Sequence, residues 1–452
     1  MRAREDKTEV FETMPIRRAV GLQILPAIAS QMIALIYNLA DTYFVGLLNE
    51  PNQTAAITVV YSSFVMLTAV SNLFGVGGAS ALSRALGKKS PEDARNIASI
   101  SIWGGILCSL IFALLFLVFS RLVLVLCGAT PEIYDIAFGY ALWVVVIGGP
   151  GTILNNLLAN LVRAEGSAAA ASIGVSMGGI LNILLDPFFV LPQFLHMGAV
   201  GAGIATALSN LAAAVFFLIW LAVRRKKTVV NLHPARLRHT ARYLKVILSI
   251  GFPSAVQYAL TVVAIAAQSS FVSRYSTEAV AALGIVKKLD QLPLYFSIGV
   301  SNGLLPLLAY NYSAGNQERR RGIFRLGCLI SLGFSLCCLI IYELFAPNLS
   351  SLFIDDPVTI RYGADFLRRM VTAMPMMSVC YPMIIQFQAM GKFKESLVCS
   401  VIRKGVLDIP LLFLMNGFLG LYGCMWVQPI VDSISLITAG IFYRRLKKAE
   451  NI

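Results

Sequence analysis

Long apolar stretches separated by short polar ones follow one another along almost the whole of this chain. A helix needs roughly 20 mostly apolar residues to cross about 30 Å of hydrocarbon, and twelve stretches meet or approach that length. The pattern therefore predicts an all-α polytopic membrane protein with twelve transmembrane helices. The expected spans lie near residues 20–47, 54–82, 97–119, 134–157, 168–192, 199–223, 246–274, 279–310, 323–345, 362–388, 396–416 and 420–443.

A basic polar stretch divides the chain near its middle, with six expected spans on either side. Matching residues recur in the same order in both halves, and an even number of spans gives both halves the same orientation in the membrane. We expect two pseudo-symmetric parts, an N-terminal six-helix lobe at 1–223 and a C-terminal six-helix lobe at 246–452, joined by a basic cytoplasmic linker at 224–245. The matching residues are Pro26 with Pro253, Asp41 with Gln268, Asp186 with Asp408, and Gly198 with Gly420.

Composition supports the membrane interpretation and explains the charge of the chain. The chain is 57% hydrophobic and only 13% charged, which is too apolar for an ordinary soluble protein. Its net charge is +14, and most of its 37 Lys and Arg fall in loops on the side of the N-terminus. This positive-inside pattern predicts that both termini are cytoplasmic. Basic loops facing anionic membrane lipids account for the charge, so we expect no nucleic-acid partner.

Polar residues with oxygen ligands lie inside the apolar stretches of the first half. A charged group in a span costs roughly 2.5–3.5 kcal/mol on insertion scales, so it is expected to face a cavity or a partner. Asp41 lies late in the first span, Asn182 and Asp186 share one face of the fifth, and Thr206 lies in the sixth. If the helices bring them together, they can bind a hard cation such as Na⁺ or share a proton. Alternatively, each aspartate is satisfied by local hydrogen bonds.

Charged residues of both signs also occur inside spans of the second half. Lys287 and Asp290 share the eighth span, where they either line a cavity of the second half or pair with each other. Lys404 stands four residues before Asp408 in the eleventh span, next to Arg403, and this spacing predicts a Lys404–Asp408 pair within the helix.

Motifs of the common enzymes are missing from the sequence. The stretch "RALGKKS" lacks the first glycine of a P-loop, and neither G-x-S-x-G nor HExxH occurs. We therefore expect no enzyme, no cofactor and no metal beyond a possible Na⁺ at the four residues of the first half. Any transport would then be driven by an ion gradient.

Several segments of the chain resemble the multidrug and toxic compound extrusion (MATE) family. They include "NLADTYFVG" at the end of the first span, "RAEG" before the fifth, "NILLDPFF" within it and "AALGIVKK" in the eighth. The resemblance covers nearly the whole chain and is closest to the DinF-like branch of bacterial efflux proteins. It implies a monomer in the plasma membrane of a prokaryote that exports cationic or amphipathic small molecules in exchange for H⁺ or Na⁺.

The resemblance also implies roles for particular residues. Asp41 and Asp186 would be the coupling carboxylates, with Asn182 and Thr206 as auxiliary ligands. Pro26 would let the first helix bend when the site changes state. The residues expected to line the substrate cavity are Tyr37, Asn38, Asn155 and Asn156.

Other functions remain open at this level. A flippase or exporter of a lipid-linked or other anionic precursor needs a cluster of cations in its cavity. The residues that keep this alternative open are Lys287, Lys288, Arg403 and Lys404. A channel or receptor is a second alternative, against which the internal repeat and the intramembrane acids argue.

Overall fold

The computed structural model describes residues 9–48, 50–233 and 240–450, and all regular structure within these ranges is helical. The first half contains α2 (Ile16–Gly46), α3 (Pro51–Gly87), α4 (Pro91–Leu126), α5 (Tyr134–Ala141), the π-helix η1 (Leu142–Ile147), α6 (Gly149–Ala164), α7 (Ala168–Val190) and α8 (Gly198–Val223). The second half contains α9 (Thr240–Val272), α10 (Thr277–Ser313), α11 (Gln317–Ser351), α12 (Pro357–Met370), the 3-10 helix η3 (Val371–Ala373), α13 (Met374–Ala389), α14 (Phe393–Val401), the π-helix η4 (Ile402–Val406) and α15 (Asp408–Glu450).

The helices have the length and composition of membrane spans. Within the described ranges, nine helices, with Pro357–Ala389 taken as one, can cross a membrane, and the pair Tyr134–Ile147 and Gly149–Ala164, bent by 45°, makes a tenth. The last two predicted spans, 396–416 and 420–443, lie in α14, η4 and α15, where a kink at Gly420 joins two helices. The all-α prediction is therefore confirmed.

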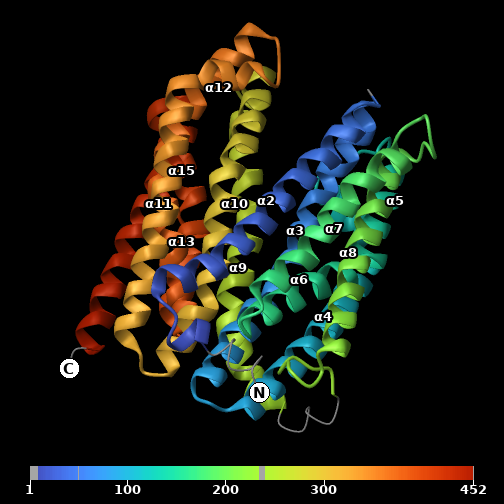
Figure 1. Ribbon diagram of the computed structural model, residues 1–452. Coiled ribbons are helices and arrows are strands. Elements are labelled where there is room, and N and C mark those ends of the chain that lie inside the picture. The colour runs from blue at the N-terminus through green and yellow to red at the C-terminus, as the bar shows by residue number, and fades with distance from the viewer. Residues whose placement is uncertain (1–8, 49, 234–239, 451–452) are drawn as a thin grey trace.

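The helices gather into two bundles that diverge toward the upper end of the molecule (Figure 1). We call α2 to α8 the N-lobe and α9 to α15 the C-lobe. The exact boundaries predicted for the lobes stay a prediction, and residues 234–239 of the predicted linker lie outside the described residues. The start of the linker, at residues 228–229, is held against the N-lobe, because Glu165 accepts hydrogen bonds from the Thr228 hydroxyl (2.7 Å) and the Val229 N–H (3.0 Å).

One hydrophobic cluster joins the two lobes at a single end. It combines N-lobe residues such as Ile24, Leu82 and Leu161 with C-lobe residues such as Ile247 and Leu304. All of these lie at the end where α2 begins and where α3, α6 and α10 end, which we call the joined end. Two other clusters lie toward the opposite, separate end, and each contains residues of one lobe only. The lobes are thus held together at one end and part toward the other.

Glycines allow the lobes to approach closely at the joined end. A side chain at Gly251 of α9 would collide with the backbone of Leu73 in α3, and one at Gly77 of α3 would collide with the Ile247 carbonyl of α9. Small residues at such crossings are typical of membrane helices, where van der Waals packing stabilises association. The α3–α9 crossing is therefore a tight contact between the lobes.

The segment 9–14 precedes α2 but docks on the C-lobe. The Phe11 ring stacks on Tyr310 of α10, with centroids 4.7 Å apart and planes at 15°. The Tyr310 hydroxyl donates to Glu12 (2.6 Å), and the Arg319 Nε of α11 donates to the Phe11 carbonyl (2.8 Å). This segment is a second connection between the lobes at the joined end.

Candidate functional site

Three helices of the N-lobe bring the predicted coupling residues together. Asp41 comes from α2, Asn182 and Asp186 from α7, and Thr206 from α8, and α7 packs against both other helices. The Asn182 side-chain N–H₂ donates to Asp186 Oδ1 (3.2 Å) and to Thr206 Oγ1 (3.3 Å). The carboxyl groups of Asp41 and Asp186 lie close enough for a proton to bridge them. The alternative of two separately satisfied aspartates does not describe this arrangement.

Three buried oxygens of this site have no hydrogen-bond donor among the described residues. They are Asp41 Oδ1, Asn182 Oδ1 and Asp186 Oδ2. Asp186 is completely buried and Asn182 nearly so. Because buried polar atoms in folded proteins almost always have a partner, a converging set of acceptors indicates a place for a proton or a hard cation.

The sequence of α7 favours this geometry locally. Asn182 and Asp186 are four residues apart, which places both side chains on the same face of the helix. Pro187 follows directly and has no N–H to donate to the Ile183 carbonyl, although α7 continues to Val190. The site therefore lies where the hydrogen bonding of the helix backbone is incomplete.

Five tyrosines from both lobes form a group around Tyr295 and stay partly exposed. Tyr295 is within electrostatic reach of the other four. The sequence analysis named only Tyr37 among the five, because the spacing of tyrosines within single spans does not show that they converge. Their faces can attract organic cations. The tyrosines are Tyr37 of α2, Tyr61 of α3, Tyr258 of α9, Tyr295 of α10 and Tyr381 of α13.

Tyr37 connects this tyrosine group to the N-lobe site, since it also lies within electrostatic reach of Asp41. Tyr140, which the sequence analysis did not name, is buried near both aspartates. An aromatic residue with a hydroxyl group inside a span is the only sequence signal for it.

The asparagines predicted for the substrate cavity occupy different surroundings. Asn38 and Asn156 are partly buried and donate to carbonyls of their own helices, at Ala34 (2.7 Å) and Thr152 (3.1 Å). Asn155 is buried inside the N-lobe and donates to Asn210 Oδ1 (2.9 Å). The structure thus groups Tyr37 with the other tyrosines and buries Asn155 against α8. Pro26 lies within α2, which runs through it without a break.

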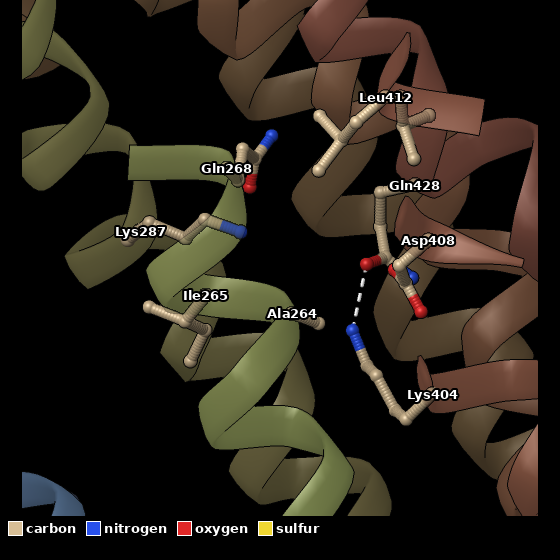
Figure 2. Close-up of a pocket in the computed structure, with 9 residues that line it drawn as sticks. Ala264, Ile265, Gln268, Lys287, Lys404, Asp408, Leu412 and Gln428 are labelled. Atoms are coloured by element: carbon tan, nitrogen blue, oxygen red, sulfur yellow. Dashed lines mark hydrogen bonds between the residues drawn. The ribbon is translucent and has the colours of Figure 1, made fainter. Parts of the chain in front are cut away.

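The charged residues of the C-lobe form a second polar cluster. Lys287, Lys404 and Asp408 line a small pocket with Gln268 and Gln428 (Figure 2). Asp290 is near Lys287, but these two described residues form no ion pair within 4 Å, so the cavity-lining alternative fits better.

The predicted Lys404–Asp408 pair is wrong. Both residues are described, and Lys404 instead donates to Gln428 Oε1 (2.6 Å), while Asp408 accepts from the Gly405 backbone N–H (2.7 Å). The backbone leaves the helix at Lys404 and Gly405, where Gly405 has φ +121°, so the four-residue spacing no longer places the two side chains together.

The sequence analysis also missed the partner of Arg403. Arg403 pairs with Asp432 of α15 (3.1 Å), and its guanidinium lies 4.0 Å from the centre of the Tyr381 ring. Both side chains of the pair are almost completely buried. An aspartate inside the twelfth predicted span was the available signal, by the same argument that singled out Asp41.

Helices in two lobes, with buried polar groups inside each, define a polytopic membrane protein. The MatE family model matches residues 26–188 and 253–414, which is more than half of the chain, so the chain belongs to the MatE family of transporters. The match falls into two parts, and these begin at Pro26 and Pro253, which the sequence analysis had paired.

Curated relatives match along almost their whole length. The multidrug export protein MepA of Staphylococcus aureus (strain MRSA252) is 29% identical over 438 residues, covering 96% of this chain and 95% of that protein. MepA of Staphylococcus saprophyticus is 27% identical over 436 residues, with the same shares covered.

Solved structures share the fold. The outward-facing conformation of a multidrug resistance MATE family transporter of the MOP superfamily gives a TM-score of 0.92 at 24% identity, covering 98% of both chains. A MOP superfamily transporter from Pyrococcus furiosus, whose binding pocket is described as having reverse polarity that suggests a different function, gives 0.91 at 23% identity, again over 98% of both. MATE transporters have twelve helices in two lobes, and the prediction of this architecture is confirmed.

Proposed function

We propose that this protein exports cationic or amphipathic small molecules across the plasma membrane in exchange for H⁺ or Na⁺, by alternating access. The observation that supports this most is the set of three unpartnered buried oxygens of Asp41, Asn182 and Asp186. Two carboxyls in contact suit a shared proton, and the same oxygens suit Na⁺. The relatives named as multidrug export proteins agree with this class of substrate.

Tyr37 links the proposed ion site and the proposed substrate site electrostatically. It lies within electrostatic reach of Asp41 on one side and of Tyr295 on the other. A cation held over the tyrosine faces and a cation or proton at Asp41 therefore oppose each other electrostatically. Exchange follows only if each ligand favours a different state of the lobes, because a ligand that binds both states equally does not shift the equilibrium between them. Bending of α2 at Pro26 is the change of state that we propose.

The direction of access follows from the joined and separate ends. If both termini are cytoplasmic, as the charge pattern predicts, the joined end faces the cytoplasm and the lobes part toward the outside. Substrate would leave from this state, and the ion entering from outside would reach the N-lobe site.

The anionic-precursor alternative gains no support from the C-lobe charges. Lys287, Lys404 and Arg403 stand near as many carboxylates, those of Asp290, Asp408 and Asp432. A site for pyrophosphate would need an excess of positive charge in its cavity.

The test is export of a fluorescent cationic dye from proteoliposomes, with a pH gradient and a Na⁺ gradient imposed separately. We expect one gradient to drive export and Asp41→Asn to reduce the driven rate at least about 100-fold, as loss of a group that transfers the proton does elsewhere. Asp135→Asn, at an exposed aspartate of α5, is the matched control and should keep the wild-type rate. Gradient-driven export at the wild-type rate by Asp41→Asn would refute the coupling role.

A further inference from the structure

The pocket of the C-lobe occupies the place that corresponds to the N-lobe site. The paired residues Gly198 and Gly420 both have left-handed backbone, with φ +58° and +59°. Gly166 and Gly391, which end "AEG" and "AMG" in the two halves, are also both left-handed. The repeat is therefore present in the backbone, and positions can be matched by counting from its anchors. The four residues of the N-lobe site then correspond to four of the C-lobe: Asp41 to Gln268, Asn182 to Lys404, Asp186 to Asp408, and Thr206 to Gln428.

All four corresponding residues of the C-lobe line one pocket (Figure 2). One contact even recurs between the lobes. In the N-lobe the Asn182 amide donates to Thr206, and in the C-lobe the Lys404 ammonium donates to Gln428. The pocket has a volume of about 10 Å³, which is room for one water-sized species. The two sites thus share a position and differ in chemistry.

The difference in chemistry is one of charge. The groups that act on Asp41 and Asp186 include no basic side chain of the described residues. In the C-lobe an amide replaces the first carboxylate and an ammonium replaces the amide of Asn182. Lys287 adds a second ammonium, at the position that corresponds to Ser63 when counted from "FGVGG" and "IGVSN".

The charges of the C-lobe balance without a mobile ion. Lys287 lies within electrostatic reach of Lys404, Asp290, Asp408 and Asp432. Asp432 is already held by Arg403 (3.1 Å) and by the Gln428 amide (2.8 Å). A buried carboxylate needs a compensating positive group, and here covalently attached groups provide it.

We infer that the Lys404 and Lys287 ammonium groups are tethered cations, which take the place of a bound ion in the C-lobe site. Only the N-lobe then exchanges an ion. The inference rests on the proposed function and deepens it, because it names residues that set the number of coupling ions. Lys404 and Lys287 are therefore specificity-determining residues, and the two similar lobes have different tasks.

The test gives the C-lobe site the two aspartates and the asparagine of the N-lobe site and leaves Gln428 in place. The triple variant Gln268→Asp, Lys287→Ser, Lys404→Asn places at each position the residue of the corresponding N-lobe position. Ions bound to the purified full-length protein are counted with ²²Na⁺ at alkaline pH, and protons by uptake from an indicator dye on acidification. Lys288→Ser, at an exposed lysine beside Lys287, is the matched control.

We expect the triple variant to bind about twice as many ions as the wild type, since both lobes then offer two carboxylates and an asparagine oxygen at corresponding positions. Lys288→Ser should keep the wild-type count. An unchanged count in a folded triple variant overturns the inference. Asp41→Asn in the same assay tests the proposed function separately, because its count should fall whatever the C-lobe does.

A second comparison covers the case in which the triple variant does not fold. Lys404→Arg keeps the tethered charge and should leave the ion count unchanged, whereas Lys404→Asn alone should raise it. Equal counts for these two variants would overturn the inference as well.

Discussion

At the scale of single residues, Asn182 connects two helices of the N-lobe site. Its amide donates to Asp186 and to Thr206, so one side chain of α7 connects α7 with α8. Its own Oδ1 is left facing the site without a donor. An asparagine fixed by its N–H₂ in this way presents its oxygen to whatever the carboxylates bind.

Removing the Thr206 hydroxyl should weaken ion binding without unfolding the lobe. Thr206→Val has nearly the same shape but deprives Asn182 of one acceptor, at a cost of about 1 kcal/mol, or roughly fivefold in affinity. The measurement is the ion concentration that gives half-maximal dye export. Thr206→Ser, which keeps the hydroxyl, should behave as wild type, and equal values for Val and Ser would show that the hydroxyl has no such role.

Pairs of helices, rather than loops, hold the two lobes together at the joined end. The α3–α9 crossing is close enough that two glycines, Gly77 and Gly251, contact the backbone of the facing helix. In a membrane such proximity stabilises association through packing, since lipid provides no hydrophobic driving force between helices.

A methyl group at this crossing should therefore be costly. Gly251→Ala would press against Leu73, and overpacking of this kind costs about 1–3 kcal/mol. We expect a lower midpoint of thermal unfolding in detergent and slower export. Gly333→Ala in α11, where an added Cβ meets no atom within 4 Å, is the control and should melt as the wild type does. Equal midpoints for both variants would contradict a tight α3–α9 contact.

Much of the architecture could be predicted from the sequence, because the length of each apolar run and the number of Lys and Arg in each loop can be read directly from it. The convergence of Asp41, Asn182, Asp186 and Thr206 needed the family resemblance as well, since separate helices have no marked register in one sequence. The prediction of a Lys404–Asp408 pair was wrong because it assumed a continuous helix. The helix breaks at Gly405, so residues four apart do not share a face there. Partners across helices, such as Asp432 for Arg403, leave no spacing signal.

Over the whole molecule, the joined end depends on a segment that belongs in sequence to one lobe and in space to the other. Phe11 is almost completely buried and stacks on Tyr310, while Arg319 donates to the carbonyls of Val10 and Phe11. Opening of this end during the cycle would have to release these contacts or carry the segment with the C-lobe.

Loss of the Phe11 ring should loosen the joined end and leave the separate end unchanged. Phe11→Ala removes a buried aromatic side chain, a change that costs about 3–5 kcal/mol in protein cores. We expect faster hydrogen–deuterium exchange at the end of α10 and the start of α11, and none of this change in α5 or α12. Phe119→Ala, at an exposed position of α4, is the control. Uniform acceleration across the chain would indicate general destabilisation instead.

The docking of segment 9–14 also has a consequence for biosynthesis. Phe11 leaves the ribosome among the first residues, but Asn311, which donates to its carbonyl, is 300 residues further along the chain. At roughly 5–20 residues per second, translation takes about 15–60 s to supply that partner. In the last part of this interval, after α8 has been made, the N-lobe has a face prepared for a lobe that is still being synthesised. Whatever covers this face in the meantime, lipid or an insertion factor, must leave when α10 arrives.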